Sequence, residues 1–193
     1  MSFVEFPKIP RLSRDIVITE KIDGTNAQIY FVGKGEINPL SLEDALGCNE
    51  YGWLFAGSKS RYLSLEGDNF GFARWVKENA EELMKLGPGR HFGEWWGPGI
   101  QRGYGLKEKR FSLFNVKKWK DERPSCCHIV PTLYEGPFDL LEVEEALLRL
   151  NAEGSLASPG FMRPEGVVVF HEAAGQVFKA TIENDETPKE LAA

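Results

Sequence analysis

Four short polar segments interrupt or border apolar stretches of this sequence, and each carries a side chain that could take part in catalysis. They are TEKIDGTN around Lys21, HFGEWWG around Glu94, RPEGVVVF around Glu165 and VFKAT around Lys179. Lysine and glutamate are rarely buried unless they are paired, so one such segment predicts an exposed edge-strand charge and two predict a structural ion pair. Four in succession, each beside glycine or aromatic residues, indicate a common function, with Lys21 as a candidate nucleophile.

The sequence lacks the motifs that carry several other kinds of nucleotide or hydrolytic chemistry. It contains no G-x-x-x-x-G-K-[ST], no strand-linked G-x-G-x-x-G, no G-x-S-x-G and no H-E-x-x-H. The three histidines have no metal-like spacing. The three cysteines, Cys48, Cys126 and Cys127, fit neither a disulfide framework nor a zinc site, which predicts reduced thiols in a cytosolic protein.

The composition is that of one globular domain. Of 193 residues, 42% are apolar and 12% aromatic, so we expect a single domain over residues 1–193 with a flexible tail from about residue 184. The formal net charge of −6 offers no long-range attraction for nucleic acid, so such a partner needs a local basic patch. No segment has the pattern of a leader or a membrane span, which predicts a cytoplasmic protein with no membrane partner.

The candidate residues lie in or beside predicted strands. Apolar alternation predicts two strands within residues 16–32, and an Asp23-Gly24 turn between them would make a hairpin. Further strands are predicted over residues 111–116, 167–170 and 176–181, the last two forming a hairpin.

Two helices are predicted by apolar residues at helical spacing. One covers residues 69–86 with Asp68 as its cap, and the other covers residues 139–152 and buries Leu140, Leu147 and Leu150. Strands surround these helices without a regular alternation, which predicts an α+β fold built on antiparallel sheets.

Short motifs in a fixed order resemble those of the covalent nucleotidyltransferase superfamily of polynucleotide ligases and mRNA capping enzymes. In chain order they are Lys21-Ile22-Asp23-Gly24 (K-x-D-G), Ser58-Lys59-Ser60-Arg61, Phe92-Gly93-Glu94, FSLFNV, Glu165-Gly166-Val167-Val168-Val169 and Phe178-Lys179-Ala180-Thr181. EKIDGTN, GEWWG and FKATIEND are most similar to the RNA ligase family. The resemblance implies a ligase-type adenylation domain, with antiparallel sheets flanked by helices and a nucleotide pocket between them.

The resemblance also implies ATP and Mg²⁺ or Mn²⁺ as cofactors, and attack of the Lys21 amine on the α-phosphorus of ATP. A free lysine has a pKa of about 10.4, so the site must favour the neutral amine through burial or nearby positive charge, which Lys179 and the metal could supply. Glu94 would accept hydrogen bonds from the ribose hydroxyls, and Glu165 would bind the metal ion or its waters.

The remaining nucleotide contacts implied by the resemblance have structural alternatives. Asp23 would position Lys21 or metal-bound water, or would serve only in the turn. Arg61 would contact phosphate or ribose, or would be a surface arginine. Asn26 would bond to the ribose or to metal-bound water, and Glu20 would read the adenine amino edge through its carbonyl or side chain.

Two aromatic residues of FSLFNV are expected on opposite faces of one strand. Phe114 and Val168 would enclose the adenine, and alternation would then place Phe111 in the core.

A local basic run follows the third polar segment. Arg102, Lys107, Lys109 and Arg110 could contact a nucleic-acid backbone, with Tyr104 available for stacking, although a solvated loop explains the run equally well.

Two departures from the family pattern bear on activity. The last motif holds Lys179 followed by Thr181, where the family commonly has K-x-K, and the sequence ends soon afterwards. We therefore expect no separate C-terminal domain, and a protein partner could compensate for it.

The motifs together predict an ATP-dependent RNA ligase acting in RNA repair in a bacterial or phage-infected cell. Its substrates would be RNA ends with a 5′-phosphate and a 3′-hydroxyl, with DNA as the alternative polynucleotide. Alternative functions are DNA nick ligation, adenylyl transfer alone, and a non-catalytic nucleotide- or RNA-binding module.

Overall fold

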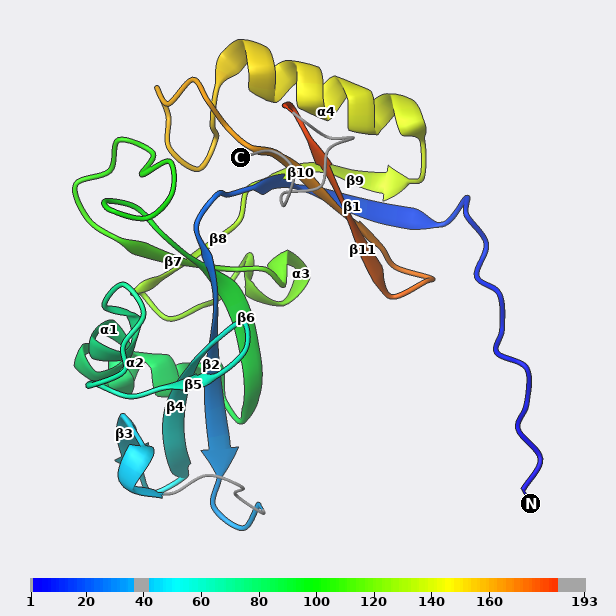
Figure 1. Cartoon of the computed structure of the whole chain (residues 1–193). Coiled ribbons are helices and arrows are strands. Elements are labelled where there is room, and N and C mark those ends of the chain that lie inside the picture. The colour runs from blue at the N-terminus through cyan, green and yellow to red at the C-terminus, as the bar shows by residue number, and fades with distance from the viewer. Residues whose placement is uncertain (1, 37–41, 184–193) are drawn as a thin grey trace. The chain divides into compact units, whose positions relative to one another are not determined.

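The computed structural model describes residues 2–36 and 42–183, and the chain divides into two compact units (Figure 1). Unit 1 comprises Met1–Lys21 and Pro131–Ala193, and unit 2 comprises Ile22–Val130. The single adenylation domain over residues 1–193 stays a prediction. The tail predicted from residue 184 lies outside the described residues.

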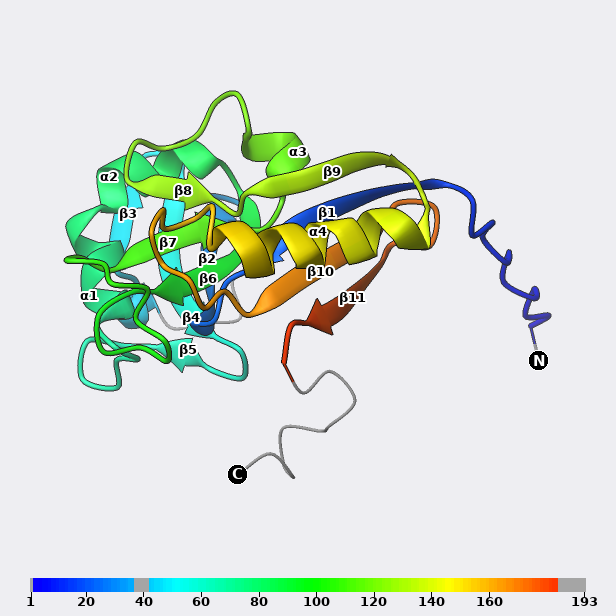
Figure 2. The same ribbon diagram turned by 90° about the horizontal axis from the view of Figure 1, so that it is seen from above.

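Unit 1 is a four-stranded antiparallel sheet with one helix packed on it. Its strand order is β11-β10-β1-β9, with β1 (Asp15–Lys21), β9 (Thr132–Pro137), β10 (Gly166–His171) and β11 (Gln176–Thr181). Helix α4 (Leu140–Glu153) lies along one face of the sheet (Figure 2). The core between them consists of Ile16, Ile18, Val143, Ala146, Leu150, Val167 and Val169. Because strand residues alternate between faces, the other face of the sheet carries Lys21.

Helix α4 begins and ends at the predicted signals. The Asp139 side chain accepts a hydrogen bond from the Leu141 N–H, and Gly154 ends the helix with a φ of 84°. Leu140 was predicted to be buried and is 60% exposed, because the buried stripe starts one turn later, at Val143. None of the helices within the described ranges is long and apolar enough to cross a membrane.

Unit 2 contains a seven-stranded sheet. The strand order is β3-β4-β2-β6-β7-β8, β5 pairs with β4, and only the β7–β8 pair is parallel. The strands are β2 (Thr25–Gly33), β3 (Gly47–Asn49), β4 (Gly52–Ser58), β5 (Tyr62–Leu63), β6 (Gly89–Trp96), β7 (Arg110–Leu113) and β8 (Cys127–Ile129).

The helical segments of unit 2 are short. They are η1 (Leu42–Asp44), α1 (Phe72–Glu78), α2 (Ala80–Leu83), η2 (Met84–Leu86) and α3 (Val116–Trp119). The predicted helix over residues 69–86 is interrupted at Asn79, whose φ is −108° and whose side chain donates to the Trp75 carbonyl. Its apolar spacing is nevertheless confirmed, because Phe72, Val76 and Leu83 are buried in the core of unit 2.

The two strands predicted around EKIDG form, but the predicted hairpin between them is wrong. Strand β1 pairs with β9 and β10, and β2 pairs with β4 and β6. Each strand therefore has both edges occupied, and neither can pair with the other. Residues 22–24 link two different sheets, and Gly24 does not adopt a left-handed conformation.

Two other strand predictions have different outcomes. The β10–β11 hairpin is confirmed, with Gly175 in its turn at a φ of 61°. The strand predicted over residues 111–116 ends at Leu113, because the Asn115 side chain accepts from the Lys118 N–H and starts α3.

Candidate active site

In unit 1, the candidate nucleophile Lys21 is paired with Glu165. Lys21 is the last residue of β1 and lies opposite Gly166 in the register with β10, which brings the preceding residue, Glu165, within reach. The Lys21 Nζ donates to Glu165 Oε2 at 2.5 Å, and the two side chains are 21% and 6% exposed. Two predicted site residues that are far apart in sequence therefore form one ion pair.

Gly166 allows this corner of the sheet to close. A Cβ atom at this position would lie 2.2 Å from the Ala180 carbonyl oxygen of β11, and Gly166 has a φ of 153°. Any side chain would therefore push β11 away from β10. A glycine is therefore needed after Glu165, because the backbones of β10 and β11 approach closely at this position.

The strand register places three predicted site residues on one face. Thr19, Val168 and Lys179 lie opposite one another across β1, β10 and β11, and Lys21 is two residues from Thr19 on the same strand. Residues opposite each other share a face, so Lys21, Val168 and Lys179 all lie on the face away from α4. Val168 is half-buried and Lys179 is exposed.

Glu20 points to the other face, where it binds the loop after α4. Its carboxylate accepts hydrogen bonds from Ser155 Oγ at 2.5 Å, the Leu156 N–H at 2.8 Å and the Ala157 N–H at 2.9 Å. The side chain is 1% exposed. Of the two adenine contacts predicted for Glu20, this geometry does not favour the one through the side chain, because the carboxylate is engaged by this loop.

Replacing Glu20 with alanine should lower the free energy of unfolding by about 2–4 kcal/mol, because several donors near the loop would lose their acceptor. The Glu20→Gln variant keeps an acceptor oxygen and should lose less. Urea denaturation at neutral pH measures both changes, and equal stability of the alanine variant and the wild type would contradict this role.

The same contact has a pH signature. Burial raises the pKa of Glu20 above its usual value of 4.5, although the hydrogen bonds from Ser155, Ala157 and Leu156 act in the opposite direction. The additional stability that a protonated Glu20 gives the native state is then fully present below pH 4.5 and is lost as the pH rises through the raised native pKa. The stability difference between wild type and Glu20→Gln should therefore shrink as the pH rises above 4.5.

In unit 2, the carboxylate of Glu94 holds the segment that follows the lysine. Glu94 lies opposite Asn26 in the β2–β6 register and is 7% exposed. Its Oε1 accepts from the Gly24 N–H and its Oε2 from Asn26 Nδ2, both at 3.1 Å. A Cβ at Gly24 would lie 2.6 Å from the Trp95 carbonyl oxygen, so glycine is required there by a close approach rather than by a turn.

Asp23 is held from two sides by residues of one loop. Arg102 Nε donates to Asp23 Oδ2 at 3.0 Å, and the Asp23 N–H donates to the Tyr104 hydroxyl at 2.9 Å. The prediction that Tyr104 is available for stacking is wrong, because the side chain is 1% exposed and packs edge-on against Trp96. Asp23 is thus positioned by this loop and does not belong to a hairpin turn.

Arg61 and Phe114 lie at the surface of unit 2. Arg61 Nη1 donates to the Gly67 carbonyl oxygen at 2.7 Å and so braces its own loop. Phe114 is 40% exposed just beyond the end of β7, whereas Phe111 is fully buried, as the strand alternation predicted. Both Arg61 and Phe114 keep the exposure that a ligand contact needs.

The predicted basic run is partly used inside unit 2. Arg102 pairs with Asp23, and Lys109 Nζ donates to the Phe70 carbonyl oxygen. Arg110 lies on β7 with a buried Nε that has no hydrogen-bond partner within the described residues. Lys107 is exposed. Because Arg102 and Lys109 make contacts within unit 2, the run is not simply a solvated loop.

Sequence reasoning missed the partners of two site residues. The Asp23–Arg102 ion pair and the Glu20–Ser155 bond join residues far apart in sequence. The signal available for the first was the clustering of glycines around Arg102 and Tyr104, which indicates a tightly folded loop. The second had no signal in the sequence.

Comparison with known proteins identifies both a family and a fold. The family model described as RNA ligase matches residues 14–181. No curated protein sequence is significantly similar to the chain.

Solved structures of Naegleria gruberi RNA ligase are similar in fold. An apo variant superposes with a TM-score of 0.59 at 19% identity, covering 88% of this chain and 50% of that chain. A variant with AMP and Mn gives 0.58 at 19% identity with the same coverage, and a variant with ATP and Mn gives 0.59 at 20% identity, covering 89% and 51%. The chain thus spans about half the length of these structures. The predicted α+β nucleotidyltransferase-type fold is confirmed.

Proposed function

The chain belongs to the RNA ligase family, and from this premise we propose that it is an ATP-dependent RNA ligase that forms a covalent lysyl-AMP at Lys21. The AMP then passes from the lysine to the 5′-phosphate of an RNA end, and attack of a 3′-hydroxyl on that phosphate joins the ends and releases AMP. The observation that carries the proposal is the pairing of Lys21 with the buried Glu165, on the sheet face that also carries Lys179.

In the first step, a bond forms between Lys21 Nζ and the α-phosphorus of ATP. The bond from that phosphorus to the bridging oxygen breaks, and pyrophosphate leaves. The lysine must give up its ammonium proton to react. Glu165 Oε2 already accepts a hydrogen bond from the amine, so it is placed to take this proton. The cation of Lys179 would offset the charge of the phosphates.

Unit 1 offers the kind of ligand that Mg²⁺ usually takes from a protein, a carboxylate. Mg²⁺ commonly takes one or two carboxylates together with substrate phosphates and water. Within residues 2–36 and 42–183 no group of three metal-ligating side chains lies together, and Glu165 supplies one buried carboxylate. The ion would neutralise phosphate charge when bound.

The residues of unit 2 fit recognition of the nucleoside. Glu94 is a buried carboxylate already ordered by Gly24 and Asn26, and carboxylate oxygens accept hydrogen bonds from ribose hydroxyls. Arg61 and Phe114 are exposed enough to contact phosphate and adenine. Asp23 is held within unit 2 by its ion pair with Arg102.

A strand-joining assay tests the proposal. The protein would be incubated with ATP, Mg²⁺ and each of four substrates: single-stranded RNA, nicked RNA duplex, nicked DNA duplex and single-stranded DNA, all with 5′-phosphates. We expect a sealed RNA product that depends on the 5′-phosphate and the 3′-hydroxyl. Sealing of nicked DNA alone, arrest at the adenylylated end, or nucleotide binding without any reaction would each overturn the assignment.

A further inference from the structure

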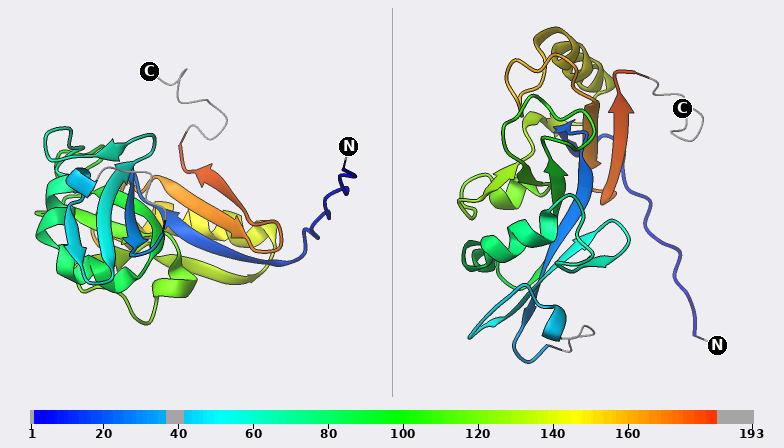
Figure 3. Two further views of the ribbon diagram at one scale, coloured as in Figure 1. Left: turned by 90° about the horizontal axis from the view of Figure 1, so that it is seen from below. Right: turned by 60° about the vertical axis from the view of Figure 1, so that its left-hand side comes forward.

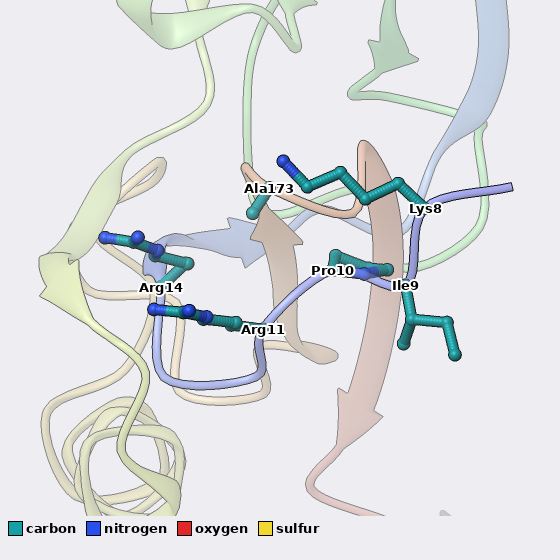
Figure 4. Close-up of a pocket in the computed structure, with 6 residues that line it drawn as sticks. All are labelled: Lys8, Ile9, Pro10, Arg11, Arg14 and Ala173. Atoms are coloured by element: carbon teal, nitrogen blue, oxygen red, sulfur yellow. The ribbon is translucent and has the colours of Figure 1, made fainter.

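The segment before β1 forms a basic pocket, and its side chains have no part in the proposed adenylylation step. The pocket has a volume of about 390 Å³ and is lined by Lys8, Ile9, Pro10, Arg11, Arg14 and Ala173 (Figure 4). All of these residues belong to unit 1. In the view of Figure 4, the guanidinium groups of Arg11 and Arg14 extend in the same direction.

The charge of this pocket is of one sign. Three of its six lining side chains are cations, and none is a carboxylate. Within the described residues no carboxylate forms an ion pair with Lys8, Arg11 or Arg14. A cluster of cations without carboxylate partners, in a protein with a net charge of −6, is a candidate binding site for an anionic group.

The base of the segment is anchored to the sheet, although the segment has no helix or strand of its own (Figure 3). The buried His171 donates from Nε2 to the Leu12 carbonyl oxygen at 2.9 Å, because its Nδ1 accepts from the Ala174 N–H. The Phe138 N–H donates to the Arg14 carbonyl oxygen at 3.1 Å. The backbone at Leu12 and Arg14 is therefore attached to the end of β10 and to the residue after β9.

The cations of this segment suit the phosphates of a polynucleotide. Lys8 and Arg11 each follow a proline in a stretch without helix or strand, and Arg14 lies just after the turn at Leu12 and Ser13. The arginine fork matches phosphate oxygens. In the same segment Phe3 and Phe6, which precede the cations, are 91% and 78% exposed, and exposed aromatic rings near cations can stack on the bases of a single strand.

We propose that this pocket binds the phosphodiester backbone of the RNA substrate. The inference rests on the proposed function for the identity of the polynucleotide. It adds a contact surface of which Lys8, Ile9, Pro10 and Arg11 lie outside residues 14–181, the range that the family model matches.

The test compares two variants of the full chain with equal charge change. One is Lys8→Ala/Arg11→Ala/Arg14→Ala, and the control is Arg74→Ala/Lys77→Ala/Lys120→Ala, which removes three exposed cations of unit 2. The probe is a 5′-phosphorylated single-stranded RNA with a 3′-fluorophore, followed by anisotropy at several salt concentrations. Lysyl-AMP formation is measured separately without RNA.

For the pocket variant, we expect the RNA affinity to fall at least about tenfold and the slope of log affinity against log salt to drop by about 2. The control variant should bind like the wild type, and both should form lysyl-AMP normally. Equal loss in the two variants would show a general charge effect and overturn the proposal. Unchanged RNA affinity with an altered oligomeric state would also overturn it, in favour of a protein partner. Absence of lysyl-AMP in the wild type would defeat the proposed function, while the comparison of RNA affinities would still decide this site.

Discussion

Replacing Lys21 with alanine is expected to abolish the covalent AMP adduct, lowering its rate of formation by at least about 10⁴-fold. The amine is the only group of this side chain that can bond to phosphorus, and no neighbouring amine on the same strand can replace it. Intact-mass analysis after incubation with ATP and Mg²⁺ measures the adduct. An adduct that persists in the Lys21→Ala variant would show that another residue is the nucleophile.

The Lys21→Arg variant is the matched control for folding. Its guanidinium keeps a cation against the buried carboxylate of Glu165, which an alanine would leave unpaired. A guanidinium remains protonated and cannot act as a nucleophile, so this variant should also lack the adduct. Thermal unfolding close to that of the wild type would then separate loss of chemistry from loss of structure.

Local sequence patterns were sufficient to predict five of the eleven strands that the described residues form, together with both ends of α4. Alternation placed Phe111 in the core, and Asp139 and Gly154 bound α4 as expected. These features depend on residues close together in the chain, where backbone preference and side-chain spacing decide the structure.

Pairing between distant segments could not be predicted in the same way. EKIDG has the local signal of a hairpin, but β1 and β2 each find two other partners. The energy of strand pairing depends on which edges are already occupied, and a short motif contains no information on that. The contact between Lys21 and Glu165 follows from the β1–β10 register. Both residues could be predicted from the sequence as site residues, but their ion pair could not.

The direction of a side chain also depends on this pairing. Glu20 and Lys21 are neighbours in sequence, and alternation sends them to opposite faces of the sheet of unit 1. Only the structure shows that the face of Glu20 is the one covered by α4 and the loop at Ser155. Its carboxylate therefore stabilises unit 1, which a motif-based assignment to adenine could not reveal.

Replacing Glu165 with glutamine is expected to slow lysyl-AMP formation by about 10²–10³-fold, the range found when one electrostatic group of a site is removed. The amide keeps the size of the side chain and an acceptor for Lys21 Nζ, but it has no charge to hold a divalent ion and is a poor proton acceptor. Single-turnover kinetics with ATP and Mg²⁺ give the rate.

The control is Glu144→Gln, which makes the same chemical change at an exposed position of α4. It should react at the wild-type rate, and both variants should unfold at similar temperatures. If Glu165→Gln reacted as fast as the control, the 2.5 Å ion pair would be structural only, and neither the charge of Glu165 nor its proton affinity would contribute to catalysis. A loss confined to Glu165→Gln would instead mean that the group holding Lys21 in the resting protein also serves the step in which the lysine is released to react.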